Sequence, residues 1–156
     1  MDCKVYLAGP EVFLPDAAAL GAQKKDLCER YGFTGLFPFD TEGGAVPIGD
    51  RADRAIYRAN VALMRDADCA IVNLTSFRGP SADVGSVFEL GMMVGLGRPV
   101  FGYSNTTTDL LSRVRQTGSV LFNDEDRVWR DQYGMRVEDF RNADNRAPRR
   151  REEGVM

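Results

Sequence analysis

Cys-Ala-Ile-Val-Asn-Leu, at residues 69–74, is the stretch that decides the fold class. It is mostly apolar and lacks the alternation of polar and apolar residues that marks a strand with one face in water. Similar short runs occur at residues 5–8, 36–38 and 99–103. All four runs are typical of buried strands in a parallel sheet.

Helix-compatible stretches separate these runs. They cover residues 16–30, 50–65, 83–97 and, more weakly, 107–115. A fifth strand is expected at residues 120–122, followed by a polar turn at 123–129. Strands that alternate with helices predict an α/β fold, with a doubly wound, mainly parallel five-stranded sheet and helices on both faces.

Length and charge limit the functional classes. The 156 residues, of which 44% are hydrophobic, fit one domain over residues 1–145, followed by a charged and poorly ordered tail at 146–156. A net charge of -3 is not expected to attract a nucleic-acid polymer or a membrane surface electrostatically. No apolar run could span a bilayer and no signal-peptide layout is present, so we expect a cytoplasmic protein.

The residue types restrict the chemistry further. There is no histidine, which excludes His-based triads and most zinc sites. The three cysteines lie far apart in the sequence without C-x-x-C spacing, and we expect them to be inert. Acid–base work must therefore fall to Asp, Glu, Tyr or Lys.

The loops after the strands are the expected ligand-binding positions, because ligands of open parallel sheets bind outside the carboxyl ends of the strands. The first loop contains Gly9 and Pro10, where glycine permits a close backbone approach. The second, at residues 73–83, is rich in hydroxyls, Gly and Pro, and is too long for a simple connection. It lacks the P-loop motif.

Glu89 is the most unusual residue of the helix that follows. The stripe predicted to face the core consists of Val84, Val87, Phe88, Gly91 and Gly95. Glu89 falls on the adjacent stripe, whose other members are Gly85, Met92, Met93 and Leu96. Burying an unpaired carboxylate costs several kcal/mol, which would offset much of the net stability of a fold. A buried Glu89 therefore needs either a partner for its charge or a functional role.

Two accounts of this helix are compatible with the pattern. In the structural account, Asp83 is only an N-cap and Glu89 pairs with a core arginine such as Arg58 or Arg78. In the functional account, Asp83 and Glu89 are two carboxylates that act on one substrate. Periodicity does not decide between them.

Several motifs taken together resemble the nucleoside 2-deoxyribosyltransferase family. They are Val-Tyr-Leu-Ala-Gly-Pro at 5–10 with Phe13, residues 60–68, Asn-Leu-Thr-Ser-Phe-Arg-Gly at 73–79, Asp-Val-Gly-Ser-Val-Phe-Glu-Leu-Gly at 83–91, Val-Glu-Asp-Phe at 137–140, and Asp-Asn at 144–145. The resemblance covers about residues 4–145. It implies a flavodoxin-like subunit of a homo-oligomer that exchanges the base of a 2'-deoxynucleoside for a free nucleobase, without a metal or organic cofactor.

The resemblance also implies roles for single residues. Glu89 matches the nucleophile that forms a 2-deoxyribosyl-enzyme intermediate, and Tyr6 matches the tyrosine whose hydroxyl holds that carboxylate. Asp83 matches the aspartate that binds the 5'-hydroxyl, and Asn145 an asparagine donated to that hydroxyl across the subunit interface. The remaining substrate-binding candidates, in the first loop and near the base, are Gly9, Phe13, Asp40 and Asn60.

The sequence departs from the family pattern in two places. Asn60 stands where some members carry an aspartate linked to the base, and an amide cannot deliver a proton at neutral pH. Asp40 is therefore the second candidate for the proton donor, and its alternative role is that of a simple turn or cap residue. After Asn145 the chain reads Arg-Ala-Pro-Arg instead of an apolar closing segment.

Two rival functions stay open: an N-glycoside hydrolase of deoxynucleosides or their 5'-monophosphates, and a nucleoside sensor. The acidic Glu11 in the first loop disfavours a 5'-phosphate.

Overall fold

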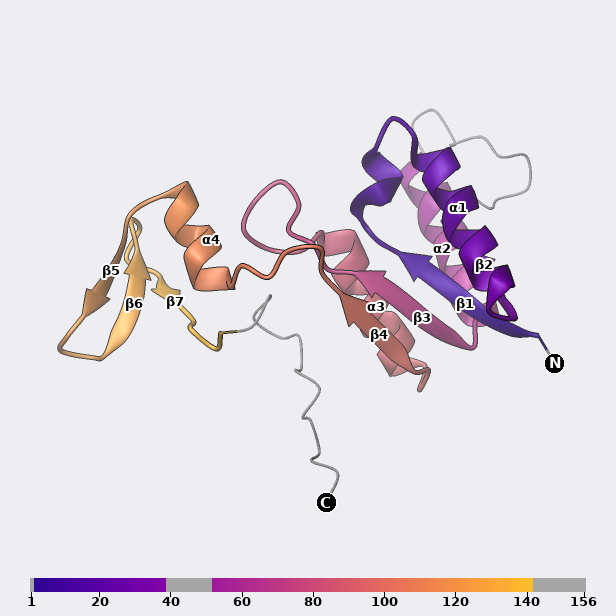
Figure 1. Cartoon of the computed structure of the whole chain (residues 1–156). Coiled ribbons are helices and arrows are strands. Elements are labelled where there is room, and N and C mark those ends of the chain that lie inside the picture. Colours follow the sequence, from indigo (N-terminus) through magenta and orange to yellow (C-terminus); the bar gives the residue numbers. More distant parts are fainter. Residues whose placement is uncertain (1, 39–51, 142–156) are drawn as a thin grey trace, which may run out of the picture. The chain divides into compact units, whose positions relative to one another are not determined.

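The computed structural model describes residues 2–38 and 52–141. Within this part of the chain the residues form two compact units, and Figure 1 labels their elements. Unit 1 comprises the described residues of Met1–Leu74 and Asp83–Tyr103, and unit 2 those of Thr75–Ala82 and Ser104–Met156. The expected tail at 146–156 lies outside the described residues.

Unit 1 carries a parallel sheet with the strand order β2-β1-β3-β4. Its elements are β1 (Cys3–Ala8), the short 3-10 helix η1 (Pro10–Phe13), α1 (Ala17–Arg30), β2 (Phe33–Leu36), α2 (Ala52–Asp66), β3 (Cys69–Asn73), α3 (Val84–Gly95) and β4 (Val100–Tyr103). From β1 the chain first moves outward to β2 and then crosses back to β3 on the other side. The carboxyl ends of β1 and β3 therefore flank a topological switch point, the usual place for a ligand in such sheets.

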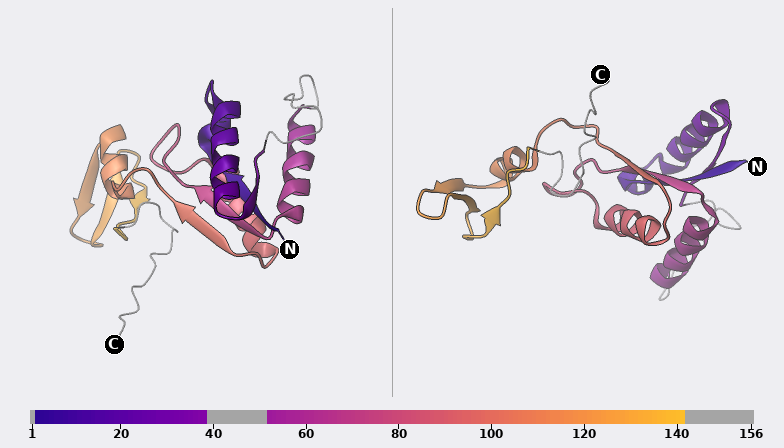
Figure 2. Two further views of the ribbon diagram at one scale, coloured as in Figure 1. Left: turned by 45° about the vertical axis from the view of Figure 1, so that its right-hand side comes forward. Right: turned by 90° about the horizontal axis from the view of Figure 1, so that it is seen from below.

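Helices cover both faces of this sheet, which confirms the predicted α/β class. Figure 2 shows α1 on one side of the strands and α2 and α3 on the other. Successive residues of β1 point to opposite faces. Val5 and Leu7 pack with Phe37 in one cluster, while Tyr6 and Ala8 belong to another. Because both faces are buried, the strand reads as a continuous apolar run.

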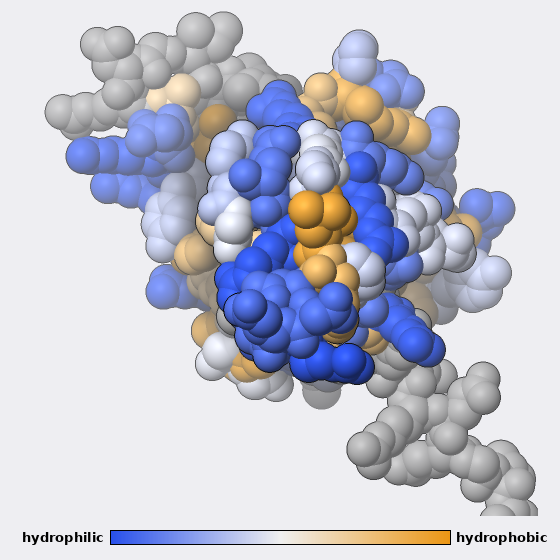
Figure 3. All heavy atoms as spheres, turned by 90° about the vertical axis from the view of Figure 1, so that its left-hand side faces the viewer, coloured by the Kyte–Doolittle hydropathy of each residue, from blue (hydrophilic) through white to orange (hydrophobic). Residues whose placement is uncertain are grey.

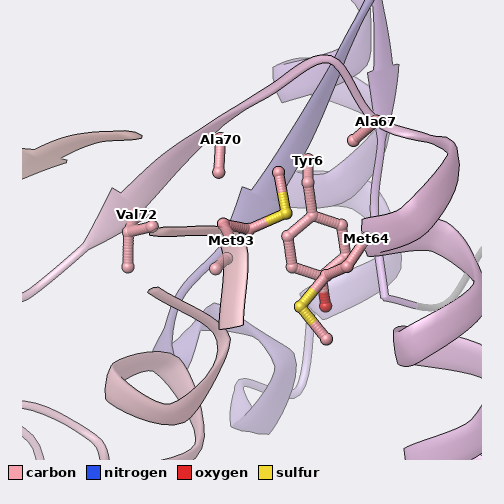
Figure 4. Close-up of a cluster of buried hydrophobic side chains, with 7 residues drawn as sticks. Tyr6, Met64, Ala67, Ala70, Val72 and Met93 are labelled. Atoms are coloured by element: carbon pink, nitrogen blue, oxygen red, sulfur yellow. The ribbon is translucent and has the colours of Figure 1, made fainter. Parts of the chain in front are cut away.

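The larger cluster is built around Tyr6. Its ring is fully buried, and Figure 4 shows it flanked by the side chains of Met64 from α2 and Met93 from α3. Ala70 and Val72 of β3 are buried members of the same cluster. A tyrosine in this position brings one polar atom, its hydroxyl, into the core between two helices.

The predicted five-strand count is wrong by one, because the strand expected at 120–122 belongs to a second sheet. In unit 2, β5 (Val120–Asn123), β6 (Val128–Asp131) and β7 (Arg136–Val137) form an antiparallel sheet in the order β5-β6-β7, preceded by α4 (Leu110–Thr117). The polar turn expected at 123–129 is shorter than predicted, since β6 begins at Val128. A local hairpin thus replaces the distant parallel pairing.

β5 is largely exposed to solvent, as is β4 at the edge of the parallel sheet. Leu121 is 71% exposed, whereas Tyr6 of β1 and Val72 of β3 are fully buried. The predicted burial is wrong for β4, whose Phe101 is 55% exposed. Figure 3 shows a narrow hydrophobic strip on a largely hydrophilic face. On the sheet itself, Phe122 packs edge-on against Trp129 at 5.0 Å between ring centroids, and Arg115 lies over Trp129 at 4.2 Å. These aromatic contacts stabilise the small antiparallel sheet, which does not depend on helices packed against both of its faces.

We expect Met93→Ala to lower the free energy of unfolding by about 2–5 kcal/mol, because the truncation leaves a cavity beside the Tyr6 ring. Met135→Ala makes the same change at a side chain that is 59% exposed, and should cost less than about 0.5 kcal/mol. Urea denaturation of both variants measures the difference. Equal losses would show that the cluster is not the core of the fold.

Candidate active site

Glu89 lies on the buried face of α3. It is 9% exposed and shares that face with Ser86 and Met93, at spacings of three and four residues. The stripe predicted to face the core is therefore wrong. Val84, Val87 and Phe88 are 84%, 48% and 51% exposed. The helix is apolar on nearly every side, so its pattern alone did not indicate which side is buried.

Two hydrogen bonds converge on one oxygen of the Glu89 carboxylate. The Tyr6 hydroxyl donates to Oε1 at 2.7 Å, and Asn60 Nδ2 donates to the same atom at 3.1 Å. Both hydrogen bonds that the described residues donate to Glu89 thus end on Oε1. They hold the carboxylate in one orientation and leave Oε2 for another partner.

The helical spacing on α2 and α3 builds this arrangement. Met64 and Met93 contact the Tyr6 ring, and Asn60 and Glu89 stand four residues before them on the same two helices. Residues four apart lie on one helix face, one turn away from each other. The two methionines therefore pack against the ring, while one turn away Glu89 accepts the hydrogen bond of its hydroxyl and Asn60 donates to the same carboxylate oxygen.

Burial changes the proton affinity of both partners. Desolvation raises the pKa of Glu89, the negative charge of Asp83 raises it further, and the hydrogen bonds from Tyr6 and Asn60 only partly offset these effects. Desolvation and the neighbouring Glu89 also raise the pKa of Tyr6 far above its usual range. Tyr6 therefore stays protonated and donates its hydrogen bond at every physiological pH.

Asp83 is the N-cap of α3, as the structural account proposed. Its Oδ2 accepts hydrogen bonds from the Ser86 backbone N–H at 2.8 Å and from Ser86 Oγ at 3.0 Å. A Cβ at Gly85 would lie 3.1 Å from Asp83 Oδ2, so the missing side chain leaves room beside Asp83. Partners of Glu89 are Tyr6 and Asn60 rather than the arginine that this account expected. The sugar-binding role of Asp83 stays a prediction.

The first loop lies at the switch point. A Cβ at Gly9 would lie 2.8 Å from Cβ of Asn73, so only glycine allows the ends of β1 and β3 to approach this closely. Phe13 ends η1 with its side chain 51% exposed. Asp40 and Asn145, which we predicted to bind the base and the 5'-hydroxyl, lie outside the described residues.

One polar cluster at the carboxyl ends of the strands was not predicted. Asn73 ends β3 and Tyr103 ends β4, and both donate hydrogen bonds to Glu11, which follows β1. Lys24 of α1 donates to the same carboxylate. The sequence could have indicated this cluster, because these residues stand at the ends of predicted parallel strands. Among the described residues, no group of three or more His, Cys, Asp or Glu is placed to hold a metal ion.

Comparison with known proteins places the fold. The 2-desoxiribosyltransferase from Leishmania mexicana superposes with a TM-score of 0.68 at 28% identity, over 92% of this chain and 83% of that one. A 2-deoxyribosyltransferase from Bacillus psychrosaccharolyticus gives 0.55 at 21% identity, over 70% and 79%, which is a likeness of fold. None of the helices in the described part of the chain is long and apolar enough to cross a membrane.

Sequence comparison gives the family. An uncharacterized protein of Schizosaccharomyces pombe is 37% identical over 108 residues, which are 67% of this chain, and the chain spans about half the length of that relative, 50%. Residues 5–146 match the family described as nucleoside 2-deoxyribosyltransferase. The matched region contains Tyr6, Asn60, Asp83 and Glu89. With this match over most of its length, the chain belongs to the nucleoside 2-deoxyribosyltransferase family.

Proposed function

We propose that the protein transfers the 2-deoxyribosyl group of a 2'-deoxynucleoside from one nucleobase to another, through a covalent intermediate on Glu89. The observation that carries this proposal is the buried carboxylate whose Oε1 receives the hydrogen bonds of Tyr6 and Asn60. Membership of the family supports the substrate class. A carboxylate held in this way is suited to nucleophilic attack with its other oxygen.

The first displacement forms an ester. Glu89 Oε2 attacks the anomeric carbon while the bond from that carbon to the base nitrogen breaks, and the base leaves with the bonding electron pair and takes up a proton. The anomeric carbon gains positive charge as this bond breaks, and the nearby carboxylate stabilises it. A 2-deoxy sugar favours this step, because it has no 2-hydroxyl to withdraw electron density.

The second displacement reverses the first. A nitrogen of the incoming base attacks the anomeric carbon and gives its proton to the group that protonated the leaving base, while the ester bond breaks and its electron pair returns to the carboxylate. Tyr6 and Asn60 hold Oε1 through both steps. Neither step requires a metal ion or an organic cofactor.

Asn60 supports the nucleophile in this scheme. Its Nδ2 is directed to Glu89, while its Oδ1 is buried without a hydrogen-bond partner among the described residues. Oδ1 is therefore left to accept a hydrogen bond from the substrate, which fits the predicted contact with the base. Because an amide does not deliver a proton, Asp40 is the proposed proton donor.

Other substrate contacts follow from the family resemblance. Gly9 and Phe13 border the base, and Asp83 binds the 5'-hydroxyl beside the open space at Gly85. Asn145 of a second subunit is proposed to reach the same hydroxyl.

We also propose that the chain forms a homo-oligomer. The exposed side chains of Val84, Val87 and Phe88 on α3 continue onto Tyr57 of α2, whose ring centroid lies 6.0 Å from that of Phe88. An exposed apolar surface on the helix that carries the nucleophile is suited to contact with a second copy.

Light scattering should give the mass of a dimer or larger oligomer for the wild type and a lower mass for Phe88→Glu. A monomeric wild type would contradict this.

We expect the protein to convert 2'-deoxyinosine and free adenine into 2'-deoxyadenosine and hypoxanthine. Glu89→Ala should lower kcat by roughly 10⁴-fold or more, because no carboxylate is left to form the ester. Glu125→Ala, at an exposed position, is the matched control and should retain full activity. Products are separated by chromatography.

Each other result of that assay has a clear meaning. Hypoxanthine without deoxyadenosine would indicate the hydrolase. An absence of turnover would favour a sensor. Undiminished transfer by Glu89→Ala would rule out the proposed nucleophile.

The pH dependence of kcat should report the ionisation of Glu89. Since its pKa is raised, kcat should fall with decreasing pH in a range above that of an ordinary glutamate. Tyr6→Phe removes a hydrogen bond that favours the charged form, so the acid limb should move to higher pH, and kcat should drop about 10- to 100-fold. Asp83→Asn removes a nearby negative charge and should move the limb to lower pH. Shifts in the same direction in both variants would contradict the assignment.

A further inference from the structure

Glu11 is the centre of a polar cluster that joins four elements of unit 1. Its Oε1 accepts hydrogen bonds from Lys24 Nζ at 2.5 Å, Asn73 Nδ2 at 2.8 Å and Tyr103 Oη at 3.1 Å. The donors belong to α1, β3 and β4, and Glu11 itself belongs to η1. One carboxylate thus ties the segment after β1 to the carboxyl ends of two strands and to the following helix.

The cluster is shielded from solvent and charged. The side chains of Glu11 and Lys24 are 12% and 23% exposed. Burial alone would raise the pKa of Glu11, but the hydrogen bonds from Lys24 and Asn73 outweigh it and lower the pKa. Glu11 is therefore ionised at neutral pH and keeps its ion pair with Lys24. Shielding makes this pair stronger than one on the open surface.

The segment that Glu11 belongs to is also held by a backbone hydrogen bond from Leu14 N–H to Glu11 O at 3.0 Å. None of the four residues of η1 is buried, and Phe13 at its end is half exposed. Val12 packs against the smaller core cluster only in part. Hydrophobic burial therefore contributes little to the position of η1, and the side-chain hydrogen bonds of Glu11 tie it to α1, β3 and β4.

Gly9 makes this tie possible. The Glu11 carboxylate folds back over Gly9, where a Cβ would collide with Oε2. Oε2 is buried there without a hydrogen-bond partner among the described residues. Leaving a carboxylate oxygen unpaired in the interior costs folding free energy. The hydrogen bonds from Lys24 and Asn73 to Oε1 offset this cost and keep the carboxylate ionised at neutral pH.

From this geometry we infer that Glu11 is a positioning residue, which fixes η1 and the side chain of Phe13 at the switch point where the nucleoside binds. The inference rests on the proposed function for its substrate. Glu11 acts through Phe13 on the binding of the substrate and leaves the chemistry at Glu89 unchanged.

The kinetic test compares Glu11→Ala with Glu11→Gln in the full chain. Glu11→Ala should raise KM for 2'-deoxyinosine about tenfold or more and change kcat less than about threefold, because the loss falls on binding. Glu11→Gln keeps an acceptor for Asn73 and Tyr103, and should restore part of the loss. Glu29→Gln, an exposed position on α1, is the control for the removal of one negative charge.

A double-mutant cycle tests the route of the effect. In a Phe13→Ala background, Glu11→Ala should change KM less than about twofold, because the side chain that Glu11 positions is gone. An unchanged KM effect in that background would overturn the inference. So would a fall in kcat at constant KM, which is the result expected from a loss of folded protein.

Hydrogen exchange separates this inference from the proposed function. The amides of residues 9–15 should exchange faster in Glu11→Ala than in the wild type or in Glu29→Gln, whether or not the protein acts on nucleosides. Unchanged exchange in this segment would overturn the tie. A wild type that neither transfers nor hydrolyses would refute the proposed function, while exchange would still decide the role of Glu11.

Discussion

The hydrogen bond from the Tyr6 hydroxyl to Glu89 Oε1 joins the core of unit 1 to its proposed chemistry. Tyr6 is fully buried between Met64 and Met93, so its hydroxyl needs an acceptor, and the buried Glu89 needs a donor. Each group meets the requirement of the other. Removing Glu89 would leave the Tyr6 hydroxyl without its acceptor, and removing Tyr6 would leave Oε1 with only the hydrogen bond from Asn60. A carboxylate can therefore stand on the inner face of an apolar helix.

This arrangement costs stability. The pKa of Glu89 is raised in the folded chain, so ionisation of this group favours the unfolded chain more than the folded one. The contribution of Glu89 to stability is greatest at acid pH and is lost as the pH rises through its folded pKa. A neutral residue would fit the core better at neutral pH, and a carboxylate retained at such a cost is typical of an active site. Glu11 shows the opposite case, because its lowered pKa keeps its contribution at neutral pH and loses it in acid.

Much of the fold could be predicted, because uninterrupted apolar runs identify the strands of a parallel sheet, but these runs overstate the burial of β4, where Phe101 is 55% exposed. The inner face of α3 could not, since a helix that is apolar almost all round gives no direction, and Val84 and Phe88 are exposed. The strand at β5 was found but placed in the wrong sheet, because a short apolar run does not show its pairing partner. The resemblance paired Tyr6 with Glu89, and the structure shows that contact. Asn60 and Glu89 meet only through the packing of α2 on α3, which the sequence does not reveal.

The most direct test of the central claim is to trap the ester. A 2'-deoxy-2'-fluoronucleoside should slow both displacements by destabilising positive charge at the anomeric carbon, so that the intermediate accumulates. Mass spectrometry of the intact chain should then show one added fluorodeoxyribosyl group, and peptide mapping should place it on Glu89. Transfer activity without any adduct, or an adduct on another residue, would contradict the account.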